Sequence, residues 1–234
     1  MIIALNNKCH LTKEEFFLYQ SNIKNLHLKG TKLVLIPSAL HISSFSSSKI
    51  SLGSQNVSSH EMGPYTGEIS AKQLKSYHVD YCLVGHYERR LMFSETNREI
   101  NRKIKNLIKE DIVPILCIGE TKEEKENHLT RDVLLKEIKE AVAELSKEEV
   151  EKIIIAYEPI WSIGTGVIPS GEEIKRHIDC IKNVYPNNKV LYGGSVNLDN
   201  VEKLTLDNIV DGYLIGGLSL HLDKIQLLID KIEK

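Results

Sequence analysis

A regular alternation between short apolar runs and longer segments with helical spacing constrains this chain more than any other feature. Eight runs have the aliphatic and β-branched character of buried strands, and they cover residues 2–5, 32–36, 50–53, 81–84, 112–117, 153–157, 190–192 and 209–215. Amphipathic segments separate them, such as the one that carries Ile100, Ile104 and Leu107. Strict alternation of this kind predicts a parallel sheet, and eight units that close on themselves predict a (β/α)8 barrel.

We therefore expect an α/β chain in which residues 1–234 form one barrel domain, because no change in composition marks a boundary. A doubly wound open sheet is the competing architecture. It calls for a glycine-rich turn after the first strand, whereas residues 6–10 read Asn-Asn-Lys-Cys-His.

The ends of several helices can also be predicted from the sequence. Thr12 followed by Glu15 is typical of a capping box, which predicts that a helix begins there. Charged and apolar residues over 122–145 predict one long amphipathic helix, and Ser219 is the expected N-cap of the last helix.

The composition excludes several functional classes. The 30 basic and 32 acidic residues leave a net charge of −2, which favours neither nucleic acid nor a membrane surface as a partner. No apolar stretch approaches the roughly 18 residues that span a bilayer, and the first residues do not predict a signal peptide. The four cysteines lack CxxC or metal spacing, so we expect reduced thiols, no metal site and a cytoplasmic location. The histidines other than His86 are expected to face solvent.

The stretch over residues 156–166 reads Ala-Tyr-Glu-Pro-Ile-Trp-Ser-Ile-Gly-Thr-Gly and carries the strongest functional signal. A buried strand ends there on the carboxylate of Glu158, and Pro159 cannot continue the ladder. The loop that follows contains the only tryptophan, Trp161, and has no regular period. A strand that delivers an acid to a glycine-bearing loop is a common way to build a site in α/β proteins.

In a barrel, the residues that follow each strand surround a single mouth. Three of them supply an ammonium, an imidazole and a carboxylate, namely Lys8, His86 and Glu158. Four others are places where bare backbone N–H groups can approach an oxyanion closely, namely Gly164, Ser195, Gly216 and Gly217. The combination predicts a small phosphorylated substrate whose reactive group reaches Glu158.

Seven motifs, in the same order along nearly the whole chain, resemble those of the triosephosphate isomerase family. They are Asn6 with Lys8 and the residues 63–68, 85–90, 117–120, 156–166, 192–195 and 216–220. Each motif alone is weak or moderate evidence for the family, whereas the whole set in this order is specific to it. The resemblance implies interconversion of dihydroxyacetone phosphate and D-glyceraldehyde 3-phosphate through an enediolate, in glycolysis and gluconeogenesis, without a cofactor.

The resemblance also implies roles for individual residues. Glu158 corresponds to the base and His86 to the electrophile. Lys8 and Asn6 would bind and polarise the substrate, and Glu88 would orient Lys8 or move a proton. The phosphate would be held by Asn6, Lys8, Gly164, Ser195, Gly216 and Gly217.

Two mobile or shared parts are implied as well. A lid would consist of Pro159, Ile160, Trp161, Ser162, Ile163, Gly164, Thr165, Gly166 and Val167, with Ile163 and Leu214 pressing on Glu158. A homodimer would form through Tyr65, Thr66 and Glu68, with Thr66 near Asn6 and Lys8 of the partner subunit. Tyr87 departs from the family pattern, which usually has Ser there, and Pro169 stands at an unusual lid hinge.

Three alternative functions compete with the isomerase. An aldolase-like barrel needs a Schiff-base lysine at a mid-barrel strand end, and a metal-dependent epimerase needs clustered His and Asp at strand ends; the sequence has neither. The remaining alternative is a non-catalytic or moonlighting barrel that acts as a binding protein. Asn6, Lys8, His86 and Glu158 argue against lost catalysis.

Overall fold

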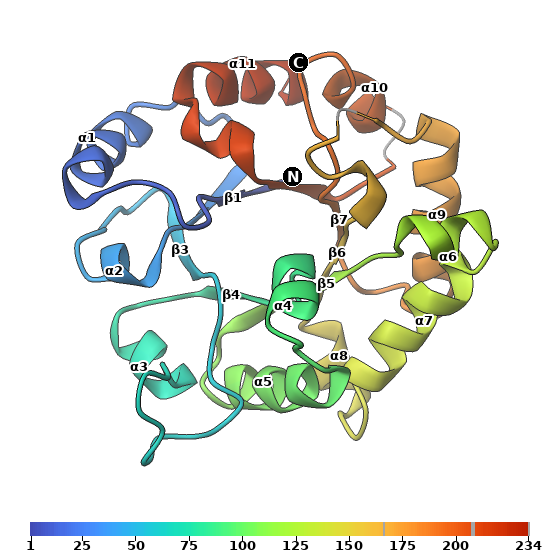
Figure 1. Cartoon of the computed structure of the whole chain (residues 1–234). Coiled ribbons are helices and arrows are strands. Elements are labelled where there is room, and N and C mark those ends of the chain that lie inside the picture. The colour runs from blue at the N-terminus through green and yellow to red at the C-terminus, as the bar shows by residue number, and fades with distance from the viewer. Residues whose placement is uncertain (166, 207–208, 234) are drawn as a thin grey trace.

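The computed structural model describes residues 1–165, 167–206 and 209–233, and its centre is a closed barrel of eight parallel strands (Figure 1). The strands are β1 Ile2–Asn6, β2 Lys32–Ile36, β3 Ser51–Ser54, β4 Tyr81–Val84, β5 Val113–Ile118, β6 Ile154–Tyr157, β7 Val190–Tyr192 and β8 Gly212–Ile215. They follow one another around the barrel in chain order, and β8 pairs with β1 to close it. The predicted (β/α)8 barrel is confirmed.

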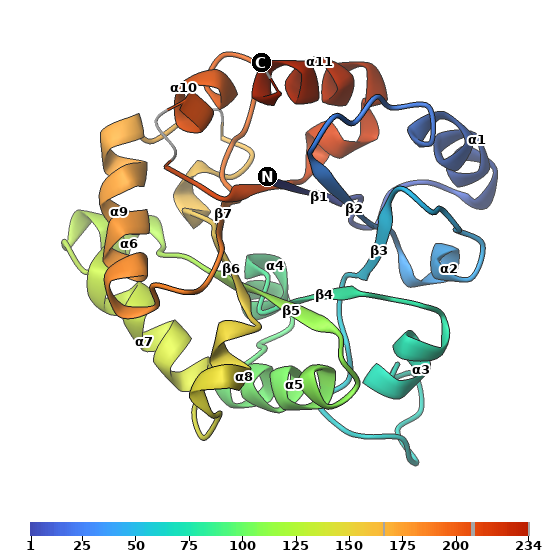
Figure 2. The ribbon, with the colours of Figure 1, turned by 180° about the vertical axis from the view of Figure 1, so that it is seen from behind.

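Helices surround the strands on all sides, as the view from behind also shows (Figure 2). They are α1 Lys13–Ile23, α2 Ala39–Ile42, α3 Ala71–Ser76, α4 Tyr87–Met92, α5 Asn97–Lys109, α6 Lys122–Glu126, α7 Thr130–Ala141, α8 Lys147–Glu151, α9 Gly171–Val184, α10 Val201–Leu206 and α11 Leu222–Ile232. Two 3-10 turns, η1 Ile160–Ser162 and η2 Gly217–Leu220, lie in loops after strands. No helix among the described residues is long and apolar enough to cross a bilayer.

The core has two layers because side chains alternate along each strand. Along β1, Ile3 and Leu5 belong to a large cluster that includes apolar residues of the helices. Their neighbours Ile2 and Ala4 belong to a second cluster made of strand residues, which fills the barrel interior. Burial on both faces explains why the strands read as continuous apolar runs in the sequence.

The capping box at the start of α1 is confirmed: the Glu15 N–H donates to the Thr12 hydroxyl, and the Thr12 N–H donates to the Glu15 carboxylate. The single long helix predicted over residues 122–145 is wrong. The chain leaves helical geometry between α6 and α7, where His128 has a φ of 58°, and begins again at Thr130.

The prediction that Ser219 caps the last helix is also wrong. Ser219 lies inside η2, where its hydroxyl donates to the carbonyl of Asn6 and accepts from the side chain of Asn7, both at 3.1 Å. The last helix begins later, at Leu222. His41 is likewise buried rather than facing solvent, because its ring stacks on Phe16 with 4.3 Å between ring centroids.

Glu233 joins the end of α11 to the start of β2. Its carboxylate accepts three backbone N–H bonds, from Lys29, Gly30 and Thr31, at 2.7–3.0 Å. Although desolvation opposes the shift, these bonds lower the pKa of Glu233 from 4.5 to about 2.

We expect Glu233→Gln to destabilise the fold by about 1 kcal/mol at pH 7, a modest value because the site is partly screened by solvent. The folded-state pKa is depressed, so the stabilisation is present above pH 4.5 and is lost as the pH falls through 2. The difference between wild type and variant, measured by urea unfolding, should therefore shrink over that range. Glu126→Gln, on an exposed helix face, is the control. A difference that stays constant with pH would contradict this account.

Candidate active site

The carboxyl ends of five strands surround one cavity of about 380 Å³. The cavity is lined by the groups predicted to react, Asn6, Lys8, His86 and Glu158, and by the groups predicted to hold an anion, Gly164, Ser195, Gly216 and Gly217. Glu88 lines a neighbouring cavity of about 360 Å³ that shares Asn6, Lys8 and His86. The structure therefore brings the residues predicted at the strand ends into one place.

Glu158 follows β6 directly and is 3% exposed. Its Oε1 atom lies 3.4 Å from Nε2 of His86, and its Oε2 atom is buried without a hydrogen-bond partner among the described residues. The side chain packs against Gly193, where an added Cβ would lie 2.7 Å from Cγ of Glu158. Burial raises the pKa of Glu158, so its carboxylate binds a proton more readily than an exposed glutamate does.

His86 is the N-cap of α4, and this position orients its imidazole ring. Its Nδ1 atom accepts a hydrogen bond from the Glu88 N–H at 3.4 Å. Nδ1 also lies 3.5 Å from Oε2 of Glu88, and in the tautomer in which Nδ1 accepts the backbone bond the ring proton is on Nε2. Nε2 is the atom closest to Glu158, so the ring can donate a hydrogen bond inside the cavity.

Lys8 and Glu88 form an ion pair beside this imidazole, with 2.6 Å between Nζ and Oε1. Burial opposes charge on both groups, yet their hydrogen bond raises the pKa of Lys8 and lowers that of Glu88. Both side chains are therefore charged at neutral pH. The Lys8 backbone has a φ of 51°, and its N–H donates to the amide oxygen of Asn6 at 3.0 Å. Because this bond occupies the amide oxygen of Asn6, the side chain would meet a substrate through its NH2 group, as a donor.

The glycines of the mouth leave backbone open to the cavity. Gly164 has a φ of 71°, a conformation that glycine adopts without strain. A Cβ at Gly216 would lie 3.2 Å from Cε of Lys8, whereas a Cβ at Gly217 would meet no described atom within 4 Å. The Ser195 hydroxyl donates to the carbonyl of Ser162 at 2.7 Å, which ties the β7 loop to η1. Backbone N–H groups near a lysine suit a phosphate.

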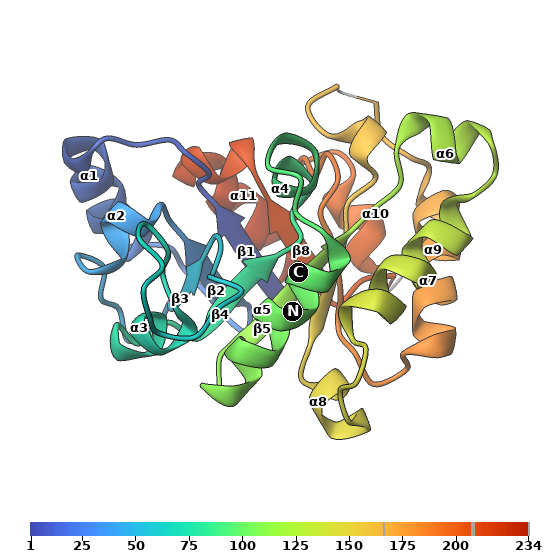
Figure 3. The same cartoon turned by 60° about the horizontal axis from the view of Figure 1, so that its bottom comes forward.

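The predicted lid contains η1, which rises above the rim of the barrel that also carries α4 (Figure 3). Trp161 anchors it by donating from Nε1 to the Glu120 carboxylate at 2.7 Å, and Tyr157 donates to the same oxygen at 3.2 Å. The Lys125 ammonium lies over the Trp161 ring, 3.3 Å from its centroid. Ile163 and Leu214 line the same cavity as Glu158, and the contact that they were expected to make with Glu158 stays a prediction. Gly166, also assigned to the lid, lies outside the described residues.

Three residues contribute to the site although the sequence pattern predicted no role for them there. Glu120 anchors the lid by accepting the hydrogen bond from Trp161. Its place shortly after the fifth strand could have indicated a role at the mouth of the barrel. Cys117 is fully buried beside Glu158, and a hydrogen bond between them partly offsets the rise in the pKa of Glu158 that burial causes. Tyr87 lines the cavity next to His86.

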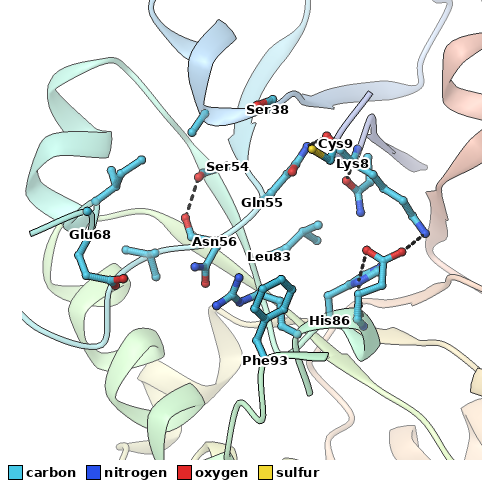
Figure 4. A pocket seen from close by; sticks show the side chains of 17 residues that line it. Lys8, Cys9, Ser38, Ser54, Gln55, Asn56, Glu68, Leu83, His86 and Phe93 are labelled. Carbon is cyan, nitrogen blue, oxygen red and sulfur yellow. Dashed lines mark hydrogen bonds and ion pairs between the residues drawn. The ribbon is translucent and has the colours of Figure 1, made fainter. Parts of the chain in front are cut away.

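Tyr65, Thr66 and Glu68 are exposed on the segment of residues 61–69, which extends away from the barrel between β3 and α3 (Figure 1). Glu68 lines the neighbouring cavity across from Lys8 and His86, with Phe93 also in its wall (Figure 4). Nε of Arg89 lies 2.5 Å from Oε2 of Glu95, and the two side chains form an ion pair. Among the described residues, no group of three or more His, Cys, Asp or Glu is arranged to hold a metal ion.

Comparison with known proteins agrees with this geometry. A family model described as Triosephosphate isomerase matches residues 1–232. The chain is similar to the triosephosphate isomerase of Clostridium tetani (strain Massachusetts / E88), with 35% identity over 98% of this chain and 95% of the relative. The corresponding proteins of Dictyoglomus thermophilum and Mesomycoplasma hyorhinis are each 38% identical, over 94% and 95% of this chain and 94% and 93% of the relatives. This chain therefore belongs to the triosephosphate isomerase family.

Proposed function

We propose that this chain is a triose-phosphate isomerase (EC 5.3.1.1) that interconverts dihydroxyacetone phosphate and D-glyceraldehyde 3-phosphate in glycolysis and gluconeogenesis. Family membership supports the reaction. The structural observation that supports it most directly is the Glu158 carboxylate. It is buried, it lies 3.4 Å from the Nε2 atom of His86, and its Oε2 atom has no hydrogen-bond partner within the described part of the chain.

The reaction moves a proton between adjacent carbons, so it needs a base that can reach a C–H bond. The free Oε2 atom of Glu158 is available for that proton, and burial makes the carboxylate a stronger base. The protonated carboxyl then returns the proton to the neighbouring carbon. A single group can serve both steps because the two carbons are adjacent.

Removal of the proton places negative charge on the substrate oxygens. The Nε2–H group of His86 would donate to the carbonyl oxygen and to the enediolate that forms from it. It would also pass the hydroxyl proton from one enediolate oxygen to the other, so that the hydroxyl and the carbonyl exchange carbons. The Lys8 ammonium adds positive charge beside the same cavity, and Asn6 supplies an amide donor. Fixed donors of this kind stabilise developing charge without reorganising during the reaction.

The phosphate would lie against Gly164, Ser195, Gly216 and Gly217, where N–H groups can approach it closely. The lid of residues 159–167 would close over the enediolate and exclude water. The bond from Ser195 to the carbonyl of Ser162 supports contact between the lid and the β7 loop. The intact reacting groups favour this isomerase over a non-catalytic binding barrel.

We also propose a cytoplasmic homodimer. The segment of residues 61–69 is exposed along its length and carries Met62, which is 62% exposed. On the wall of the neighbouring cavity Phe93 is 66% exposed, and Met92 beside it is 71% exposed. Large apolar side chains gathered around one protruding segment and one cavity are typical of a protein interface. Thr66 would enter that cavity in the partner subunit.

We expect Glu158→Asp, which retracts the carboxylate by one methylene, to lower kcat by about a hundredfold in a coupled assay of glyceraldehyde 3-phosphate isomerisation. Wild-type kcat/KM should fall as the pH drops through a pKa above 4.5, because burial raises the pKa of Glu158 and only the carboxylate accepts a proton. Glu126→Asp on the surface is the control. An acidic limb below pH 4.5, or near-wild-type turnover of the variant, would contradict the assignment.

Gly193→Ala tests whether the position of the Glu158 carboxylate matters. The added methyl group would press on Cγ of Glu158 from 2.7 Å and displace the carboxylate. We expect turnover to fall by about tenfold to a hundredfold with the fold retained by circular dichroism. Gly30→Ala is a matched control, because nothing lies within 4 Å of its added Cβ. Equal activity of the two variants would refute the positional requirement.

Sedimentation velocity should give a mass twice the 26.5 kDa of one chain. Thr66→Arg should shift the protein toward monomer, because it would bring a cation toward Lys8 of the partner subunit. Ser48→Arg adds the same side chain at another exposed position and should leave the dimer intact. A wild type that remains monomeric at tens of micromolar would rule out the homodimer.

A further inference from the structure

Tyr87 is the first residue of α4 and lies where three of the proposed reacting groups meet. Its ring centroid is 4.8 Å from that of His86, and the Lys8 ammonium lies 5.4 Å from the same ring centroid. Its hydroxyl lies 3.3 Å from Oε1 of Glu88. The side chain also lines the cavity proposed to take the substrate.

The hydroxyl shares its acceptor with Lys8. Oε1 of Glu88 accepts from Lys8 at 2.6 Å and from Tyr87 at 3.3 Å. Burial raises the pKa of Tyr87, so the phenol keeps its proton and donates. Two donors that converge on one oxygen fix the rotation of the Glu88 carboxylate, and with it the place to which the Lys8 ammonium is drawn.

The aromatic ring constrains Lys8 in a second way. A lysine ammonium sits on a flexible four-carbon stem and is strongly hydrated, so without a partner it samples many positions. The Lys8 side chain is 21% exposed and therefore has access to water. A ring face within about 6 Å attracts the ammonium and limits this movement.

We propose that Tyr87 is a positioning residue that holds the Lys8 ammonium and the Glu88 carboxylate in place beside the substrate cavity. It acts through Lys8 and needs no contact with the substrate. The inference rests on the proposed isomerase function, in which Lys8 binds the phosphorylated substrate. Removing the hydroxyl loosens one of the two constraints, and removing the ring as well loosens both.

The test compares Tyr87→Phe and Tyr87→Leu with wild type in the isomerase assay. We expect KM to rise about threefold for phenylalanine and about tenfold for leucine, the sizes typical of losing a hydrogen bond and then a cation–π contact, with a smaller change in kcat. Tyr185→Phe removes a half-buried hydroxyl far from the cavity and should change neither constant. A residue needed only for folding would not produce this graded change in KM.

A second measurement follows the effect of Lys8 on phosphate affinity, without catalytic turnover. Binding of inorganic phosphate by calorimetry should weaken in the same order, from wild type through Tyr87→Phe to Tyr87→Leu. Phosphate affinities and KM values of folded Tyr87→Phe within twofold of wild type would overturn the inference, and so would a loss confined to kcat. A wild type that binds phosphate but does not isomerise would instead refute the proposed function and leave the binding series as the test of Tyr87.

Discussion

The barrel depends on one close approach, between β8 and β1. Gly212 pairs there with Ile2, and a Cβ at this glycine would lie 2.0 Å from the Ile2 carbonyl oxygen. No larger residue fits without moving one strand away from the other, so the closing ladder requires glycine at this point. Closure removes the free sheet edges and turns the carboxyl ends of all eight strands toward one mouth. Asn6 and Gly216, near opposite ends of the chain, share a cavity for that reason.

The two carboxylates in this mouth have different surroundings. Lys8 and Glu88 satisfy each other, which keeps both ionised in spite of partial burial. Glu158 is more deeply buried, and its Oε2 atom has no hydrogen-bond partner among the residues that the structure describes, which costs stability because that oxygen is poorly solvated there. That cost is also the source of its basicity. His86 lies between these groups, with Nδ1 toward Glu88 and Nε2 toward Glu158.

The barrel and most of its site could be predicted from the sequence, because buried parallel strands leave uninterrupted apolar runs and the reacting groups follow directly after them. The break at His128 could not, since α6 carries only Lys and Glu and so has no apolar spacing whose interruption would mark the end of one helix and the start of the next. Ser219 was misassigned because local capping chemistry predicted its role, whereas its real partners are Asn6 and Asn7 at the other end of the chain. The contact between Tyr87 and Lys8 likewise depends on how two loops meet in space.

The most direct test of proton transfer through Glu158 is isomerisation in D2O, followed by proton NMR of the product. A carboxyl group that carries the abstracted proton exchanges it with solvent, so we expect deuterium at the carbon that receives the proton. The same experiment with Glu158→Gln should give no deuterium above the uncatalysed background. Deuterated product formed by Glu158→Gln at the wild-type rate would contradict a mechanism through the Glu158 carboxylate.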